Sequence, residues 1–391
     1  MKKILFIFSI GMLIFITNSC KKDKLGPVVN NGVAPGSISN VIVTNLNGAA
    51  SISYSLPLDS DLLYIEAKYT TKQGIVRQTK VSRYNSSITV DGFEDTSAYQ
   101  VTLNAVNKGE NVSFPIVVTA HPLIPIFKLV RDSLMIIKDF GGVNVAFKNL
   151  TASNLAIIVL AVDSLGNFTP ANTYYTSLRT GNFSTRGLKS VDTKFGFYVR
   201  DRWGNISDTL VLHLTPLFEA KLDRTKMVGL ALPTDAPLGY GGTISALFDG
   251  DITNGNNSYY HTGDAARMPQ WFTFDMGVSA KISRLVWFMR MGFYYNLHNP
   301  RNVQIWGSNN PPADGSFTNW TLLATHEQVK PSGLPGGQLS QDDVTAAQAG
   351  ETINFPLNTP KVRYIRFETT RNWSGGSYVN FTEISMYGDI N

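Results

Sequence analysis

Short runs in which apolar and polar residues alternate dominate the chain between residues 40 and 216. Examples are SISYSL (51–56) and VNVAFK (143–148). A period of two is that of a β-strand with one buried face, because successive side chains point to opposite sides of the sheet. Gly, Asn and Asp separate the runs, and helical periodicity is rare. The pattern predicts that this part of the chain is all β.

The alternating part contains an internal repeat. NVSFPIVVTAHPL (111–123) matches NISDTLVLHLTPL (205–217) at an offset of 94 residues. A repeat of this length indicates a duplicated domain rather than a solenoid unit. About 95 residues of short strands fit an antiparallel β-sandwich. We therefore predict module 1 at 40–120 and module 2 at 121–216, and both resemble fibronectin type III or immunoglobulin-like modules.

The composition changes after residue 217, where five of the six tryptophans lie. Six sequence elements occur there in a fixed order: ALFDGD, QWFTFDMG, PRNVQIWGS, WTLL, VRYIRF and TEISMYG. This order resembles the discoidin, or coagulation-factor type C, family, which includes the family 32 carbohydrate-binding modules. The resemblance implies an eight-stranded jelly-roll sandwich over 217–391. The expected fold class is all-β, with two tandem immunoglobulin- or fibronectin-III-like sandwiches followed by a discoidin-like domain.

The N-terminus has the pattern of a secretory signal. Lys2 and Lys3 precede the apolar run ILFIFSIGMLIFI (4–16), which is shorter than the roughly 20 residues of a membrane span. Cys20, the only cysteine, follows TNS and resembles the lipidated cysteine of a loose Bacteroidetes lipobox. The prediction is a signal peptide at 1–19 and a Gly-, Pro- and Asn-rich tether at 20–39. The alternative is an unlipidated signal with an incidental cysteine.

The whole arrangement resembles accessory lipoproteins of Bacteroidetes glycan-utilisation systems. The resemblance implies a lipid-anchored outer-membrane lipoprotein, on the cell surface or the periplasmic face, with transport or binding lipoproteins as candidate partners. Without Lys2 and Lys3 the formal charge falls from +5 to +3. That charge is too small and too dispersed to indicate nucleic-acid binding.

Catalytic patterns are missing from the sequence. The five histidines form no H-E-x-x-H pair, and neither G-x-S-x-G nor a P-loop is present. Acids are sparse after residue 217, and Asp275 belongs to the turn in FDMG. We predict a non-catalytic protein, and the alternative is an enzyme with an unrecognised pair of carboxylates.

The loop LFDGDITNGNNSYYHT (247–262) is a candidate calcium site. It lacks the glycine and the closing glutamate of an EF-hand, although closely spaced oxygen ligands suit Ca²⁺. The discoidin resemblance implies one structural calcium shared by Asp249, Asp251 and Glu383, with Thr253 or Asn254 as helpers. The alternative is that Asp249 caps a tight turn while Glu383 hydrogen-bonds its backbone.

Three loops, at 258–270, 291–302 and 371–378, combine aromatic rings with polar side chains, as carbohydrate binding requires. We expect stacking on Trp373 and one of Tyr294 and Tyr295, while Tyr260 and the tryptophans at 271, 287, 306 and 320 are expected mostly in the core. Since Tyr, Trp and Arg also anchor protein interfaces, the alternative is a structural or assembly lipoprotein whose loops bind a protein partner. The candidate ligand-binding residues are Tyr259, His261, Arg267, Tyr294, Tyr295, His298, Arg301, Arg371, Asn372, Trp373 and Tyr378.

Overall fold

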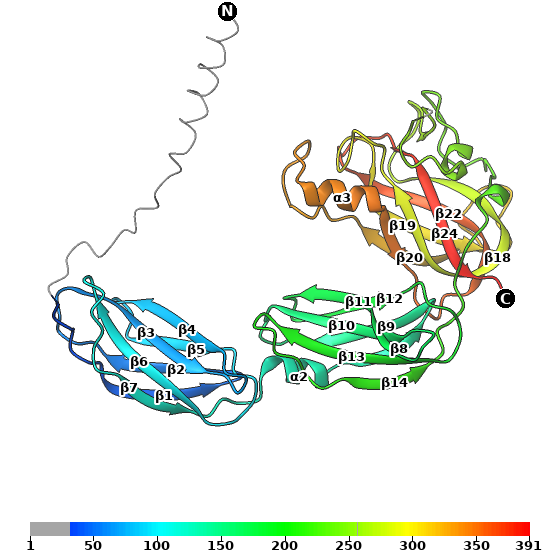
Figure 1. Cartoon of the computed structure of the whole chain (residues 1–391). Coiled ribbons are helices and arrows are strands. Elements are labelled where there is room, and N and C mark those ends of the chain that lie inside the picture. The colour runs from blue at the N-terminus through cyan, green and yellow to red at the C-terminus, as the bar shows by residue number, and fades with distance from the viewer. Residues whose placement is uncertain (1–31, 256) are drawn as a thin grey trace, which may run out of the picture.

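The computed structural model describes residues 32–255 and 257–391, which form three β-rich units in series (Figure 1). The signal peptide, Cys20 and tether residues 20–31 lie outside the described residues, so the lipidation of Cys20 stays a prediction. Along the part of the chain that is described, none of the helices is both long and apolar enough to cross a membrane.

Module 1 is a sandwich of two antiparallel sheets, with strand orders β1-β2-β5 and β4-β3-β6-β7. Alternate residues of facing strands, such as Ile52, Ile65 and Leu103, are fully buried between the sheets. The strands are β1 (Ser39–Leu46), β2 (Ala49–Ser55), β3 (Leu62–Thr70), β4 (Val76–Ser82), β5 (Ser87–Asp91), β6 (Tyr99–Asn107) and β7 (Ile116–Ala120).

Module 2 repeats this topology in its sheets β8-β9-β12 and β11-β10-β13-β14. The Ser113 hydroxyl accepts a bond from the Ala105 N–H at 2.9 Å, and the Ser207 hydroxyl accepts one from the Val199 N–H at 3.0 Å. The two serines are 94 residues apart, and so are the two residues that donate to them, so the duplication is confirmed. The elements are α2 (Ile126–Asp132), β8 (Met135–Asp139), β9 (Gly142–Lys148), β10 (Leu155–Val162), β11 (Phe168–Thr176), β12 (Thr180–Thr185), β13 (Thr193–Asp201) and β14 (Leu210–Leu214).

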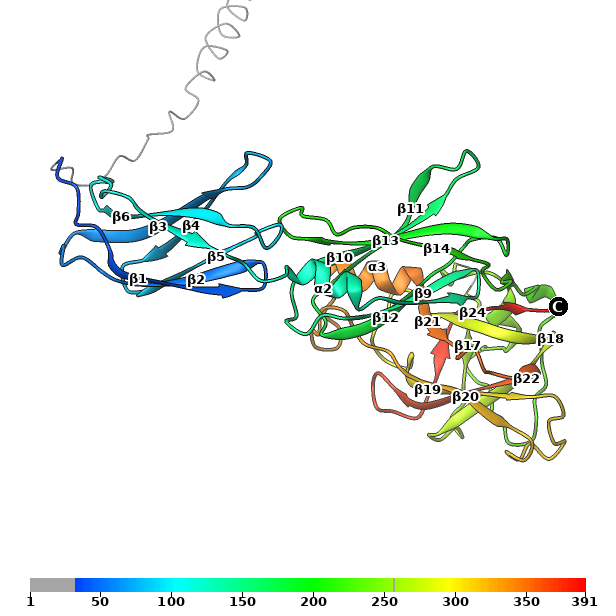
Figure 2. The same ribbon diagram turned by 90° about the horizontal axis from the view of Figure 1, so that it is seen from below.

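Helix α2 is an element that the alternating pattern did not predict. It begins directly after Pro125, lies where modules 1 and 2 meet end to end (Figure 2), and buries Phe127 and Val130 in the core of module 2. Its two buried residues are three positions apart, and a helix of two turns is too short to show a clear period in the sequence.

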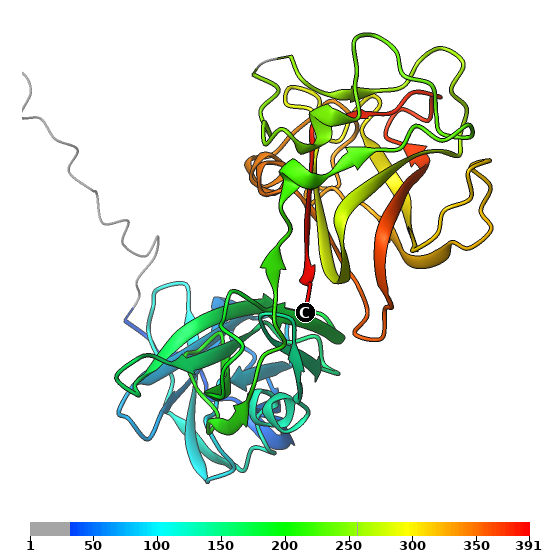
Figure 3. The same ribbon diagram turned by 90° about the vertical axis from the view of Figure 1, so that its right-hand side faces the viewer.

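The C-terminal domain is built on one large antiparallel sheet in the order β15-β24-β18-β22-β19-β20, with β16 and β21 also paired to β18. Figure 3 shows it beside module 2, connected by the chain that enters β15. The all-β fold class is confirmed. The elements are β15 (Ala220–Lys221), η2 (Arg224–Lys226), β16 (Val228–Gly229), η3 (Ser245–Phe248), β17 (Tyr260–His261), β18 (Gln270–Phe288), β19 (Pro300–Ser308), β20 (Thr321–Glu327), α3 (Gln341–Ala349), β21 (Glu351–Asn354), β22 (Lys361–Asn372), β23 (Asn380–Phe381) and β24 (Glu383–Asp389).

The tryptophans of this domain occupy two environments. Trp287 is fully buried in the core, as expected, and Trp320 is buried where its ring packs against Arg366. Trp271 and Trp306 are only half-buried, and both pack against Phe317 at centroid distances of 4.8 and 5.0 Å. Residues on β18 alternate between faces, so Trp271 points away from the core that its neighbour Phe272 enters. The expectation of a core position is corrected for these two residues.

Arg366 is a fully buried arginine on β22. The rings of Trp271, Phe317 and Trp320, which we call the outer aromatic group, surround it. Its guanidinium lies 4.5 Å from the Phe317 ring centroid and 4.6 Å from that of Trp320. It donates to the Gly315 carbonyl at 2.9 Å and to the Thr273 hydroxyl at 3.1 Å. The charge is therefore buried among cation–π contacts and fixed acceptors.

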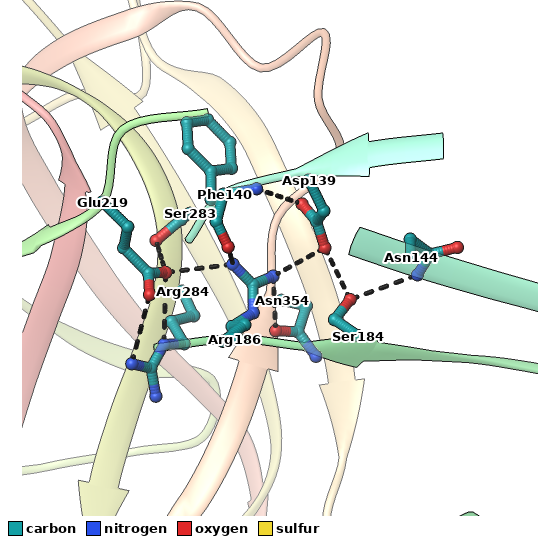
Figure 4. Close-up of polar contacts among 9 residues, drawn as sticks. All are labelled: Asp139, Phe140, Asn144, Ser184, Arg186, Glu219, Ser283, Arg284 and Asn354. Carbon is teal, nitrogen blue, oxygen red and sulfur yellow. Dashed lines mark hydrogen bonds and ion pairs between the residues drawn. The ribbon is translucent and has the colours of Figure 1, made fainter. Parts of the chain in front are cut away.

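A buried polar network joins module 2 to the C-terminal domain (Figure 4). Glu219, just before β15, accepts from Arg186 of module 2 at 2.9 Å and from Ser283 of β18 at 2.6 Å. Arg284 lies 3.3 Å from the same carboxylate, and Arg186 also pairs with Asp139 at 3.3 Å. The two units are thus connected by charge pairs that exclude most solvent.

Candidate carbohydrate-binding site

Five rings from four segments meet at the end of the C-terminal domain. We call Tyr240, Tyr259, His261, His298 and Tyr378 the Tyr240 patch. The Tyr240 ring lies 4.8 Å from His261 and 5.8 Å from Tyr378, and His298 lies 5.8 Å from His261 and 5.1 Å from Tyr378. Tyr240 is 57% exposed, so a ligand can reach its ring from solvent.

The backbone next to Tyr240 packs closely against His261 of β17. Gly242 lies so close to His261 that an added Cβ would stand 2.3 Å from the His261 backbone nitrogen, which leaves room only for glycine. Tyr240 itself has a φ of 54°, a left-handed conformation that is unusual for a bulky residue. Strain of this kind costs about 1–3 kcal/mol and is concentrated at functional sites.

Hydrogen bonds fix the rings of the patch. The hydroxyls of Tyr240 and Tyr378 both donate to the exposed carboxylate of Asp264, at 2.7 Å for Tyr378. These bonds hold the pKa of Asp264 below its ordinary value and raise that of Tyr240. The Tyr259 hydroxyl donates to the Tyr240 carbonyl at 2.9 Å, and the Arg290 guanidinium lies 4.2 Å from the centroid of the Tyr259 ring.

The two histidines are electrostatically coupled. Burial lowers the pKa of His261 and of His298 below the ordinary value of 6.5, and the Arg290 guanidinium lowers both further. His261 also contributes to the lowered pKa of His298. Both rings are therefore neutral near pH 7, a state in which one ring nitrogen donates and the other accepts.

Buried polar atoms without a hydrogen-bond partner are found in residues of these same segments. Among the described residues they include His298 Nδ1, Asn380 Oδ1, Arg290 Nε and Gln270 Oε1. Asn380 pairs with His261 between β17 and β23, and its N–H donates to the His298 carbonyl at 3.0 Å. Buried polar groups are normally paired, so such a concentration indicates a place where water or a ligand completes the bonding.

Trp373 and Tyr295 lie in a neighbouring cluster with Met289 and Ala347. The Arg301 guanidinium lies 4.7 Å from the Trp373 centroid, the edge-on Tyr295 ring lies 5.4 Å away, and the indole N–H donates to Gln328 at 2.8 Å. Trp373 is half-buried and contacts these neighbours, and its predicted role as a stacking platform stays a prediction.

Other predicted residues occupy different positions. Tyr295 and Asn372 are 1% and 0% exposed, and the Asn372 amide donates to the carbonyls of Gly376 and Tyr378, which shapes the loop beneath the patch. Arg267 and Arg371 are exposed, and the Arg267 guanidinium donates to carbonyls of its own loop. Tyr294 is half-buried. The structure thus brings Tyr259, His261, His298 and Tyr378 together, and the loop of Arg267 supplies Asp264.

Three residues of the patch region were missed from the sequence: Tyr240, Asp264 and Arg290. Tyr240 stands in the glycine-rich stretch GYGG (239–242), and an aromatic residue between turn glycines is a recognisable signal. Asp264 lies inside the predicted loop 258–270, and its carboxylate has no aromatic neighbour in the sequence that marks it as a ligand contact. Arg290 ends an apolar strand run, and nothing in the sequence indicates that its charge faces the histidines.

In the candidate calcium loop, the hydrogen bonds are those of the alternative interpretation, in which Asp249 caps a tight turn and Glu383 bonds to the loop backbone. Asp249 accepts the Asp251 N–H at 2.7 Å, and Glu383 accepts the Gly250 N–H at 3.0 Å. Asp251 accepts both the N–H and the hydroxyl of Thr253, at 2.9 and 2.7 Å. Within residues 32–255 and 257–391, no three His, Cys, Asp or Glu side chains are grouped as metal ligands. As placed, these donors do not fit a three-carboxylate site, and calcium binding stays a prediction.

A cation of the protein itself lies at this loop. The Arg224 guanidinium packs directly against Gly250, where a Cβ would stand 1.9 Å from Nη1. Burial raises the pKa of Glu383 to about 7, and the neighbouring Asp249 raises it while Arg224 and Lys221 lower it. Arg224 thus partly neutralises the acidic loop.

Three family descriptions match successive parts of the chain, and all three are domains of unknown function: DUF4959 at 35–122, DUF5126 at 123–225 and DUF5000 at 248–388. No curated protein shows significant similarity to the chain. A solved structure described as a SusE-like protein is 33% identical, and the match covers 68% of this chain and 99% of that chain, with a TM-score of 0.45.

Two further solved structures are each similar to less than half of the chain. One is the family 32 carbohydrate-binding module of NanJ from C. perfringens in complex with galactose, 18% identical over 44% of this chain and 99% of that chain, with a TM-score of 0.31. The other is a two-domain fibronectin type III segment of chicken tenascin, 15% identical over 46% of this chain and 99% of that chain, with a TM-score of 0.23.

Proposed function

The chain belongs to the family of SusE-like proteins, and on that premise we propose that it is a non-catalytic, membrane-anchored protein that binds glycan through the Tyr240 patch. The observation that carries the proposal is an exposed tyrosine, held in a strained backbone conformation, within a group of rings whose polar partners are fixed.

The patch has the two components that sugar binding needs. A pyranose ring presents an apolar C–H face, which packs on an exposed aromatic ring such as Tyr240 or Tyr378. Its hydroxyls then find the Asp264 carboxylate as acceptor and the neutral His298 ring beside it. Because Asp264 is already held by two tyrosine hydroxyls, little side-chain freedom is lost on binding.

The N-terminal modules act as a spacer in this proposal, and a lipid on Cys20 anchors the protein to the outer membrane. Lipidation with more than one acyl chain gives stable anchoring. Mass spectrometry of the protein purified from membranes tests this part separately, since an acylated N-terminal Cys20 is expected.

The test of the patch is native electrophoresis of residues 32–391 through gels that contain soluble polysaccharides. Tyr240→Ala and Tyr378→Ala are expected to weaken binding about tenfold or more, which corresponds to roughly 1.4 kcal/mol. Tyr240→Phe keeps the ring and is expected to retain more binding than Tyr240→Ala. Tyr84→Ala is the control, since Tyr84 of module 1 is 82% exposed and remote from the patch in sequence. The proposal would be refuted if both alanine variants were retarded as strongly as the wild type. It would also be refuted if no glycan retarded the chain and a partner lipoprotein were captured instead.

A further inference from the structure

A groove runs from the joint between modules 1 and 2 along the end of module 2. It consists of two hollows of about 390 and 670 Å³, which share Asn154, Leu155, Asp201 and Arg202. The first hollow is lined by both modules, including Thr89 and Asp91 of module 1. Binding sites for small molecules are typically about 300–1,000 Å³ and are frequent where domains meet.

The internal repeat shows that Trp203, in this groove, is not needed by the turn that carries it. The Asp201 carboxylate accepts the N–H groups of Trp203 and Asn205, at 2.8 and 2.9 Å. In module 1, Asn107 accepts the N–H groups of Gly109 and Asn111, both at 3.0 Å. The two turns are equivalent, with glycine where module 2 has tryptophan. The indole is therefore an addition that faces the joint.

The walls of the groove are held together across the joint. Arg77 of module 1, which is buried, donates to the Trp203 carbonyl and to Asn205 Oδ1, both at 3.3 Å. Asn205 donates to the Gly92 carbonyl of module 1 at 3.0 Å, and Arg77 donates to the same carbonyl. A site between units that are already connected loses little freedom when a ligand enters.

The lining has aromatic rings in both hollows and no net charge. Trp203 lines the first hollow and is 39% exposed, and Tyr175 of β11 lines the second and is 72% exposed. Arg77 and Arg202 both lie 5.1 Å from the Trp203 centroid, and the Arg202 side chain is 58% exposed and pairs with Asp91. A ligand on the indole would displace the exposed Arg202 rather than the buried Arg77.

The charged lining residues are two acids, Asp91 and Asp201, and two arginines, Arg200 and Arg202. This balance favours neither an anion nor a cation. Together with the rings and the Asn154 amide, it fits a neutral polyhydroxylated chain that is long enough to extend over both hollows.

We propose that this groove is a second carbohydrate-binding site, specific for a neutral oligosaccharide. One sugar ring stacks on Trp203 and another on Tyr175, and Asp201, Arg202 and Asn154 bind hydroxyl groups between them. The site shares no residue with the Tyr240 patch, and its argument does not depend on that patch.

The test uses residues 32–391 in affinity gels containing soluble starch, galactomannan, arabinoxylan or mixed-linkage β-glucan, with polygalacturonate as the anionic probe. Four variants are compared: Trp203→Gly, which copies the turn of module 1, Tyr175→Ala, Tyr240→Ala, and the control Tyr84→Ala. We expect at least one neutral polysaccharide to retard the Tyr240→Ala chain. Trp203→Gly and Tyr175→Ala should each weaken that residual binding about tenfold, and Tyr84→Ala should not.

Several results would overturn the groove. The proposal fails if no neutral probe retards the wild-type chain, or if polygalacturonate alone retards it. It also fails if Tyr240→Ala abolishes all retardation, or if Trp203→Gly and Tyr175→Ala are both retarded as strongly as the wild type. If Trp203→Gly fails to fold, Tyr175→Ala decides, because its side chain is largely exposed. Binding that survives Tyr240→Ala unchanged but is lost in the groove variants supports the groove while the proposed patch fails, so the two proposals are separable.

Discussion

Replacing Glu219 by alanine should loosen the C-terminal domain from module 2. The substitution removes the acceptor of Arg186 and Ser283 and one ion-pair partner of Arg284. Ser283 is fully buried and the Arg186 side chain is only 13% exposed, so water does not replace the lost bonds easily. Breaking a buried charge pair on one side costs on the order of 3–5 kcal/mol.

The lower end of that range applies here. Arg186 keeps Asp139 as a partner at 3.3 Å, and Arg284 is 24% exposed and partly solvated. We expect a loss of about 3 kcal/mol in the free energy of unfolding. For a unit of this size each kcal/mol corresponds to roughly 2–4 °C, so the melting temperature should fall by roughly 6–12 °C.

The assay is thermal and urea unfolding followed by tryptophan fluorescence, which reports mainly on the C-terminal domain because five of the six tryptophans lie there. Limited proteolysis of the segment 215–223 adds a local readout, and cleavage should be faster in Glu219→Ala. The matched control is Glu327→Ala, whose carboxylate is 50% exposed and has an ion pair with Arg301 at 3.1 Å. Exposed pairs contribute up to about 1 kcal/mol. If the two variants lose the same stability, within 1 kcal/mol, and are cleaved at the same rate, the network does not hold the joint.

Three further predictions concern the C-terminal domain. Because the pKa values of His261 and His298 are below 6.5 when folded, the unfolded chain takes up more protons as the pH falls below 6.5. The stability that the neutral rings contribute is complete above pH 6.5 and should be lost as the pH falls through the folded pKa values; a His298→Asn melting curve that keeps the full wild-type pH dependence would contradict this. Arg366→Lys should lower the free energy of unfolding in urea by about 2–3 kcal/mol, since a lysine cannot keep both the stacking on Phe317 and Trp320 and the hydrogen bonds to Thr273 and Gly315. A loss below about 0.5 kcal/mol would refute the stabilising role of these ring contacts. Because Arg224 supplies the positive charge beside Gly250 and Glu383, Arg224→Met should lower the melting temperature more than EDTA lowers that of the wild type, and the reverse order would establish a structural calcium.

The sequence predicts the architecture better than the site, for a physical reason. Strand alternation is a local signal, the repeat at an offset of 94 residues is a comparison of two whole segments, and each is carried by many residues. The core position of Phe272 follows from its place in an alternating run, whereas the outward position of Trp271 follows only once the face is known. Alternation alone therefore could not separate the core tryptophans from those around Arg366.

The site depends on contacts between loops that are distant in sequence. Tyr240 and Tyr378 are 138 positions apart and meet at Asp264. Composition indicated that loops 258–270 and 291–302 were rich in suitable side chains, but it could not show which rings point outward. Trp373 illustrates the limit, because a tryptophan beside two glycines suggests exposure, while Arg301 and Gln328 occupy its neighbourhood in the fold.

The polar contacts at Arg77 and at Glu219 together determine the distance between the two proposed glycan-binding sites. When two sites sit on a flexible linker, the second binding event samples many distances and tolerates many ligand lengths. Polar contacts across both joints hold the groove and the Tyr240 patch at one separation. If both proposed sites bind glycan, avidity arises only for polymers that span that distance, and the protein then selects its ligands by chain length.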